Sequence, residues 1–270
     1  MAELSANIAA AARPRAGKGA QLWKDPRLLG LLSVIIGLGL WELAADSFSA
    51  LILPPPSAVL ARFFDPAFLP RLLGALGYSL GALVVGFGLA LGLALPLGVV
   101  LGRSPTLHRM FDPLINAIYA IPPVAFVPFL IIWFGLFFEG RVALVFMMCF
   151  FDILVVVIAG SRDVRRSLVD VGRSFGASRG QCLRLVVFPA LTPFLFAALR
   201  VGSARAINGM ITAELFFAAA NLGQIMKRST QAFDTASALA VVVTICLLGL
   251  AAQTAIQLLE RRLLSWHLRG

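Results

Sequence analysis

Apolar runs of membrane-spanning length dominate this sequence and limit the folds that it can adopt. A helix needs about 20 consecutive apolar residues to cross the hydrocarbon core of a bilayer. Of the 270 residues, 60% are hydrophobic and 13% are charged. A soluble domain has about a quarter of its residues charged. The sequence therefore predicts an all-α, multi-pass membrane protein with little mass outside the bilayer.

Six spans are predicted from these runs. Their expected bounds are 28–45, 72–101, 114–138, 141–160, 189–220 and 236–259. A cleaved signal peptide is the alternative for the first run, but the basic region before it is long for a signal, which favours an uncleaved helix. The stretch 47–71 contains three consecutive prolines, and we expect a linker without regular helix there.

The basic residues predict the orientation. With six spans both termini lie on one side, and sixteen Lys and Arg residues then fall on that side against five on the other. Loops rich in Lys and Arg stay in the cytoplasm, so both termini are expected there. The predicted organisation is a cytoplasmic tail (1–27), a transmembrane permease domain (28–260) and a second cytoplasmic tail (261–270).

Two of the predicted spans have unusual compositions. The second contains seven glycines between Gly74 and Gly98, and small residues let membrane helices approach closely, so this span is expected to pack against protein. The third is interrupted by Pro122, Pro123 and Pro128, and each proline removes a backbone donor and frees a carbonyl. This interruption indicates either a broken helix that lines a substrate path or a packing kink.

Polar residues within the spans are the candidates for the translocation path. Charged groups inside a membrane are usually functional, although structural ion pairs are the alternative. Asp152 lies about ten residues into its span, and we expect it to pair with Arg205 of the next span, or else with Arg200. The path candidates are Tyr119, Pro122, Pro123, Asn208, Asp152 and Glu214.

The stretch 163–189 is the only long polar segment in the second half of the chain, and it predicts a helix, a sharp turn and a second helix. Apolar residues recur with helical spacing at Val164, Leu168, Val171 and Phe175. Gly176 ends this pattern, as glycine does at helix C-termini. Ser178 and Gln181 then have the spacing of a capping box, and the helix that they start runs on into Pro189.

This stretch resembles the cytoplasmic loop of ABC importer permeases. That loop reads Glu-Ala-Ala, three residues, Gly, nine residues, Ile-x-Leu-Pro. Here Asp170-Val171-Gly172, Gly176 and Val186-Val187-Phe188-Pro189 stand at the same spacing, with Asp170 in place of the glutamate and Val171 and Gly172 in place of the alanines. By itself the stretch also fits an ordinary basic loop between two spans.

Segments over roughly residues 50–255 extend the resemblance to the permeases of nitrate, sulfonate, taurine and bicarbonate importers and of relatives that import vitamin precursors. The matching segments are Leu53-Pro54, Gly86 to Gly102, Asp112-Pro113, Ile121 to Pro128, Trp133-Phe134-Gly135, Ala213-Glu214-Leu215 and Leu222-Gly223. Members often carry Pro, Asn and Thr near the end of the fourth span, where this chain has Asp152, Val156 and Val157. No single substrate is therefore predicted. The resemblance implies a small organic anion, such as a sulfonate, taurine or nitrate, or a vitamin precursor.

The resemblance implies a type I importer permease in the inner membrane. Its implied partners are a second permease subunit, identical or different, two cytoplasmic ATP-binding subunits, an extracytoplasmic substrate-binding protein and membrane lipid. The residues implied to couple to the ATPase, within a loop at 162–189, are Asp170, Gly172, Gly176, Ala177, Ser178, Arg179 and Pro189.

Neither an enzyme nor a nucleic-acid-binding protein is expected. The chain has no phosphate loop of the Gly-x-x-x-x-Gly-Lys-Ser/Thr kind and no recognisable nucleophile with its base, so ATP and Mg should bind to a partner subunit and no cofactor to this chain. Its three cysteines lack metal-ligand spacing. Loop arginines account for the net charge of +10 without nucleic acid. The rival functions are a secondary transporter or channel that uses the charges within the spans, and a lipid-modifying membrane enzyme.

Reporter fusions test the predicted orientation. A reporter placed after Arg13 and another placed after Arg262 should both give the signal of the cytoplasm, because sixteen of the basic residues outside the spans lie on that side. An extracytoplasmic signal from either fusion would show that the orientation is wrong.

Overall fold

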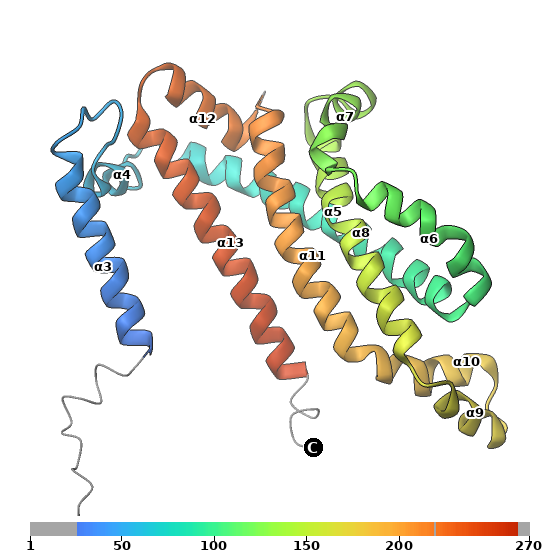
Figure 1. Ribbon diagram of the computed structural model, residues 1–270. Helices are drawn as coiled ribbons and strands as arrows, with labels where there is room; N and C mark the ends of the chain where they lie inside the picture. Colours follow the sequence, from blue (N-terminus) through green and yellow to red (C-terminus); the bar gives the residue numbers. More distant parts are fainter. Residues whose placement is uncertain (1–25, 219, 264–270) are drawn as a thin grey trace, which may run out of the picture. The chain divides into compact units, whose positions relative to one another are not determined.

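The computed structural model describes residues 26–218 and 220–263, and every regular element in those ranges is a helix (Figure 1). The all-α prediction is confirmed for this part of the chain. The lysines and arginines counted in the two tails lie outside the described side chains, so the tails and the orientation of the termini stay predictions.

The chain divides into two compact units at Ala61/Arg62. In the first unit, α3 (Pro26–Ala45) exposes apolar side chains along most of its length, as a helix in contact with lipid does. A short helix, α4 (Pro56–Arg62), begins within the stretch expected to be a linker. That expectation was wrong in part, because a proline is tolerated in the first turn of a helix, where its missing donor has no intrahelical partner. The carboxylate of Glu42 accepts hydrogen bonds from the Ser57 backbone N–H and hydroxyl.

The second unit is built on the contact between α5 (Leu69–Arg103) and α8 (Phe138–Asp163). Small residues occur on α5 at every fourth position: Gly86, Ala90, Ala94, Gly98 and Gly102. A Cβ atom on Gly98 would lie 2.7 Å from the Cβ of Val157. One on Gly86 would lie 2.8 Å from the Val142 carbonyl oxygen. The predicted packing of this span against protein is confirmed for this face, and the backbones meet so closely that larger side chains are excluded.

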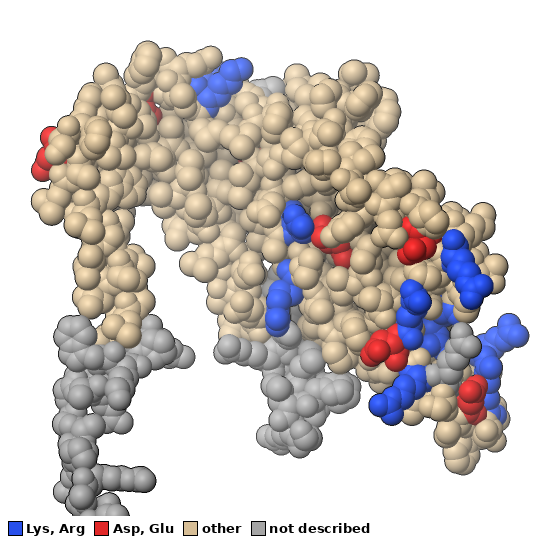
Figure 2. Space-filling view, viewed as in Figure 1, with Lys and Arg blue, Asp and Glu red and all other residues tan. Residues whose placement is uncertain are grey.

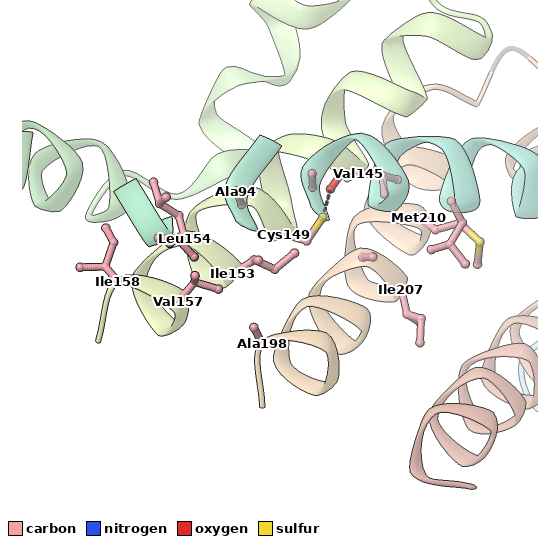
Figure 3. Packing of buried hydrophobic residues seen from close by; sticks show 14 of the residues in the cluster. Ala94, Val145, Cys149, Ile153, Leu154, Val157, Ile158, Ala198, Ile207 and Met210 are labelled. Atoms are coloured by element: carbon pink, nitrogen blue, oxygen red, sulfur yellow. Dashed lines mark hydrogen bonds between the residues drawn. The ribbon is translucent and has the colours of Figure 1, made fainter. Parts of the chain in front are cut away.

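The third helix of the core is α11 (Phe188–Phe216). Buried residues of α8 repeat at every fourth position, at Val145, Cys149, Ile153 and Val157. Figure 3 shows these side chains with Ala94 of α5 and Ala198 of α11 in one apolar cluster. The core is therefore a three-helix contact with α8 at its centre.

The predicted third span is a broken helix. It consists of α6 (Pro105–Tyr119), a 3₁₀ turn (Pro123–Phe126) and α7 (Val127–Phe134), and the two parts are bent by 82°. Pro122 and Pro123 at the break have no N–H to continue the helix. The helix begins at Pro105 because the Ser104 hydroxyl caps it by accepting from the Leu107 N–H, so Arg109 lies on a helix and not in the loop that the span bounds implied.

Five helices in the described residues are long and apolar enough to cross a membrane, and six if the bent pair counts as one span.

Two elements follow α11. Helix α12 (Asn221–Gln231) occupies a segment between the fifth and sixth spans that was expected to be a loop, and α13 (Thr235–Leu263) is the last span. The carboxylate of Asp234 caps α13 by accepting from the N–H and hydroxyl of Ser237. Burial opposes ionisation of this carboxyl, but the bonds from Ser237 and the adjacent Arg62 guanidinium lower its pKa overall.

A pair of leucine substitutions tests the contact of small residues. Gly98→Leu should lower the amount of folded protein and its thermal midpoint, because overpacking a tight contact costs roughly 1–3 kcal/mol. Gly92→Leu, on the same helix with no atom within 4 Å of its added Cβ, is the matched control and should be close to wild type. Equal losses in both variants would mean that α5 and α8 do not depend on this contact.

Candidate functional site

A pocket of about 280 Å³ lies where the broken span meets α8 and α11. Its polar lining consists of Tyr119 at the end of α6, Asp152 of α8 and Arg205 of α11. Pro123, at the break, forms part of the wall. The pocket therefore brings these polar side chains together beside the interruption of the helix.

The three polar side chains form one connected group. The Tyr119 hydroxyl donates to Asp152 Oδ1 over 3.1 Å, and Arg205 Nε lies 3.4 Å from Asp152 Oδ2. The predicted pairing of Asp152 with Arg205 is therefore confirmed. The Asp152 side chain is only 10% exposed, whereas the Arg205 side chain is 50% exposed. The carboxylate thus holds the guanidinium in place while part of the guanidinium stays available to a solute.

The other path candidates have different positions. Pro122 is exposed and precedes the pocket wall, and Asn208 is exposed one helical turn from Arg205. That these residues line the route stays a prediction.

Glu214, another path candidate, lies in a separate buried polar cluster and not at the pocket of Asp152. Its Oε1 accepts from the Ser79 hydroxyl at 2.6 Å, and its Oε2 accepts from the Gly223 N–H at 2.7 Å. Arg141 Nη2 lies 3.7 Å from Oε2, and both side chains are almost fully buried. The cluster joins four helices, α5, α8, α11 and α12, and it leaves no access for a solute.

The same cluster fixes the turn after α11. Arg141 donates to the carbonyl oxygens of Phe217 and Ala220, each over 2.8 Å. A Cβ atom on Gly223 would lie 1.8 Å from the Glu214 carbonyl oxygen, so only glycine fits. Sequence reasoning missed Arg141, because an arginine at the start of an apolar run was counted as a loop residue. Its partners lie far away in the sequence and gave no local signal.

The polar stretch between α8 and α11 forms the expected helix, turn and helix. Helix α9 (Arg166–Ser174) is closed by Gly176, two residues after its last residue, and the φ of this glycine is +81°. The Ala177 N–H donates to the Gly172 carbonyl and the Gly176 N–H to the Arg173 carbonyl, which together make a Schellman cap. The positive φ explains why a glycine is needed at this position.

Helix α10 (Arg179–Cys182) starts at the predicted capping box. Ser178 and Gln181 each accept a hydrogen bond from the other's backbone N–H. A π-helical segment, Leu183–Val187, joins α10 to α11, and the Phe188 N–H donates to the Leu183 carbonyl. Pro189 has no donor for an α-helical bond at this joint, and the π turn lets the helix continue past it. The helical segment therefore runs from Arg179 to Phe216 over 38 residues.

The two short helices pack against each other and leave an apolar stripe uncovered. A Cβ on Gly172 would contact Cys182 Sγ and Val186 at 3.5 Å, so the alanine of the resembled motif would fit there. Val164 is buried at the end of α8, but Leu168, Val171 and Phe175 are 48%, 55% and 89% exposed. Asp170 and Arg179, two of the residues expected to couple to the ATPase, are also exposed.

Alanine substitutions test the pair at the pocket. Arg205→Ala should destabilise the protein more than Asp152→Ala, because it leaves a buried carboxylate unpaired, whereas a half-exposed guanidinium can be hydrated. The double variant should lose less than the sum of the two single losses, with a coupling of about 0.5–3 kcal/mol in thermal or denaturant unfolding. Strictly additive losses would show that the two side chains do not interact.

Comparison with known proteins relates this geometry to a family. Residues 94–265 match the family model described as the binding-protein-dependent transport system inner membrane component. The taurine transport system permease protein of Escherichia coli is 29% identical over 88% of this chain and 89% of its own length. A probable ABC transporter permease protein of Brucella abortus is 30% identical over 90% and 96% of the two chains.

Two further similarities agree with this assignment. The riboflavin transport system permease protein of Chloroflexus aurantiacus is 32% identical over 88% of this chain and 90% of its own. A solved inward-facing structure of the MetNI methionine ABC transporter has the same fold, with a TM-score of 0.61 and 19% identity over 73% of this chain and 98% of that chain. The chain thus belongs to the binding-protein-dependent transport system inner membrane components and is the permease subunit of an ABC importer.

Proposed function

We propose that α9, Gly176 and α10 form the surface that an ATP-binding subunit contacts. The observation that carries this proposal is the exposed stripe of Leu168, Val171 and Phe175 on a helix whose end is fixed by a Schellman cap. The stripe lies in a polar, arginine-rich loop, where lipid tails do not cover it. An apolar patch of this kind marks a protein interface.

The helix that follows supplies the mechanical connection to the pocket. At 1.5 Å per residue, 38 residues extend about 57 Å, against a bilayer core of about 30 Å. The α10 end therefore protrudes beyond the membrane, while Arg205 lies on the same unbroken segment. A displacement of α10 by the ATPase changes the surroundings of Arg205 at the pocket.

The proposed assembly contains two permease subunits, two ATP-binding subunits that hold ATP and Mg, and an extracytoplasmic substrate-binding protein. The family's dependence on a binding protein supports the last of these. The absence of a phosphate loop from the sequence supports placing ATP hydrolysis on another subunit. The loop at 162–189 and both termini then lie in the cytoplasm, in agreement with the distribution of basic residues.

We further propose that the pocket at Tyr119, Asp152 and Arg205 is part of the route and that the cargo is a small organic anion of the sulfonate type. A guanidinium binds a sulfonate through two parallel hydrogen bonds, and half of the Arg205 side chain is available for this. The carboxylate of Asp152 offsets the charge of Arg205 in the pocket, and it can pair with an ammonium group on the same solute. Relatives named for taurine and aliphatic sulfonates support this choice over the heterocycles of other relatives.

Gly176→Val tests the proposed coupling surface. The left-handed φ at this position costs a non-glycine residue roughly 1 kcal/mol or more, and a β-branched residue adopts it poorly. The orientation of α10 should change, while the spans still insert into the membrane. We expect near-normal amounts in the membrane, poor transport and loss of the ATPase stimulation by the loaded binding protein in the purified complex.

The matched control is Gly74→Val, which introduces the same side chain at an open helical position with ordinary dihedral angles. It should insert normally and keep the stimulated ATPase activity. Asp170→Ala should act like Gly176→Val but more mildly. Normal transport and stimulated ATPase in Gly176→Val would remove this loop from the mechanism.

A further inference from the structure

A second, larger cavity opens at the loop end of the helix core, apart from the pocket at Asp152. It has a volume of about 820 Å³ and lies between the end of α5, the start of α6, the end of α8 and α9. Its ionisable lining comprises Arg103, His108, Arg109, Arg162, Asp170 and Arg173. Figure 2 shows that Lys and Arg side chains gather at this end of the molecule. Four guanidinium groups against one carboxylate leave the cavity strongly positive.

Two of these arginines have protein partners and two do not. Arg103 Nη1 donates to the Ser161 and Val164 carbonyl oxygens at 3.4 and 3.3 Å and so covers the C-terminal end of α8. Arg162 contacts the His108 ring. Within residues 26–218 and 220–263, neither Arg109 nor Arg173 has an ion-pair or hydrogen-bond partner for its side chain. Both side chains are exposed, and their charge is uncompensated in the sense that no described carboxylate lies within ion-pair distance of either.

Two polar atoms buried at the same cavity lack partners. Ser161 is 0% exposed, and its hydroxyl makes no hydrogen bond to any described group. The Nδ1 atom of His108 is likewise buried and unpaired within the described part of the chain. A buried polar atom without a partner needs an explanation, and a bound molecule, an ion or a water is one explanation. Two such atoms beside two uncompensated arginines indicate an anionic ligand that accepts hydrogen bonds.

The start of α6 adds to the positive potential. Pro105, the first residue of this 15-residue helix, lines the cavity, so the positive end of the helix dipole faces it. The opposing negative end of α8 is covered by Arg103. The N-terminus of α6 and the arginine side chains thus favour an anion, against the negative C-terminal end of α5, which lies at the same cavity.

We propose that this cavity binds a phosphate-bearing anion, held by Arg109 and Arg173 with the Ser161 hydroxyl as a further contact. A planar guanidinium matches a phosphate through two parallel charge-assisted hydrogen bonds. The cavity lies where spans leave the apolar region, so the ligand is either the headgroup of an anionic phospholipid or a soluble phosphate compound. Its occupant would join the start of the broken span to α9. The proposal stands independently of the substrate and of the ATPase contact.

The experiment uses the full-length chain in nanodiscs of two compositions. One contains phosphatidylcholine only, and the other contains phosphatidylcholine with phosphatidylglycerol. A second arm adds inorganic phosphate or glycerol 3-phosphate to the phosphatidylcholine nanodiscs. The thermal midpoint and the bound lipid seen by native mass spectrometry are measured. Stabilisation by phosphatidylglycerol alone identifies a lipid headgroup as the ligand, and stabilisation by the soluble compounds identifies a free phosphate compound. Either result supports the site.

Variants attribute the effect to the cavity. Arg109→Gln with Arg173→Gln should weaken binding about tenfold or more, the loss expected for hydrogen bonds to a charged group. Ser161→Ala should weaken binding less and leave the ligand-free midpoint unchanged or higher, because it removes an unpaired hydroxyl. Arg184→Gln is the matched control, since Arg184 is exposed on the same loop but does not line the cavity, and it should bind as wild type does.

Three results would overturn the proposal. No stabilisation by any phosphate-bearing probe would show that the cavity holds no such anion. Equal weakening by Arg184→Gln would show only a diffuse attraction of basic residues to anions. Loss of association with an ATP-binding subunit in the double variant, without any change in phosphate or lipid binding, would assign the arginines to that protein interface.

Discussion

The close approach of α5 and α8 is the constraint on which the rest of the described second unit depends. Apolar surface gives little driving force for association inside a bilayer, so helices associate through backbone proximity and dispersion contacts. The small residues at every fourth position of α5, from Gly86 to Gly102, provide this proximity. At the last of them a Cβ on Gly102 would lie 2.4 Å from the Cβ of Ser161, beside the basic cavity. About two turns before the first lies Ser79, which binds Glu214. The contact between α5 and α8 thus extends from near the Glu214 cluster to the basic cavity.

The two ion pairs within the spans show how burial separates structure from function. Arg141 and Glu214 are 1% and 2% exposed, and their remaining hydrogen bonds go to backbone groups and Ser79. Removing one partner of such a pair costs roughly 3–5 kcal/mol, so it fixes the arrangement of four helices. Asp152 and Arg205 have opposite signs at a similar separation, but the Arg205 side chain is 50% exposed and lines a pocket. Only this second pair can exchange its protein partner for a solute.

Local sequence signals identified the loop well and the tertiary polar contacts poorly. The turn at Gly176 and the capping box at Ser178 follow from neighbouring residues, and the spacing of a known motif reinforced both. The pairing of Asp152 with Arg205 followed from their opposite charges in consecutive spans, although Arg200 remained the alternative partner. The buried cluster around Glu214 was not predicted, because its partner Ser79 lies 135 residues away and a long-range contact leaves no periodic signal.

Segments with mixed polarity were the other source of error. Helix α12 was expected to be a loop because Leu222, Ile225 and Met226 are too few for an apolar run. They nevertheless form one face of a short helix that packs on α5 and α13. The basic cavity was invisible for a different reason. Its four arginines come from four helices, and only the meeting of α5, α6, α8 and α9 places them together.

The loop and the pocket connect the same two helices at different levels, the loop at their ends and the pocket near the middle of α8. Under the proposed coupling, this is the route by which a movement of the loop would reach the pocket. Helix α8 leads directly into α9, and α10 continues through the π turn into α11. At the loop end the two are joined by the packing of Gly172 against Cys182 and Val186. At the pocket they are joined by Asp152 and Arg205. If a partner displaces α9 and α10 together, α8 and α11 must move as one body against α6. If it separates them, the pair at Asp152 comes under strain. The π-helical segment Leu183–Val187 and Pro193 are the irregular positions between loop and pocket at which part of this motion can be absorbed.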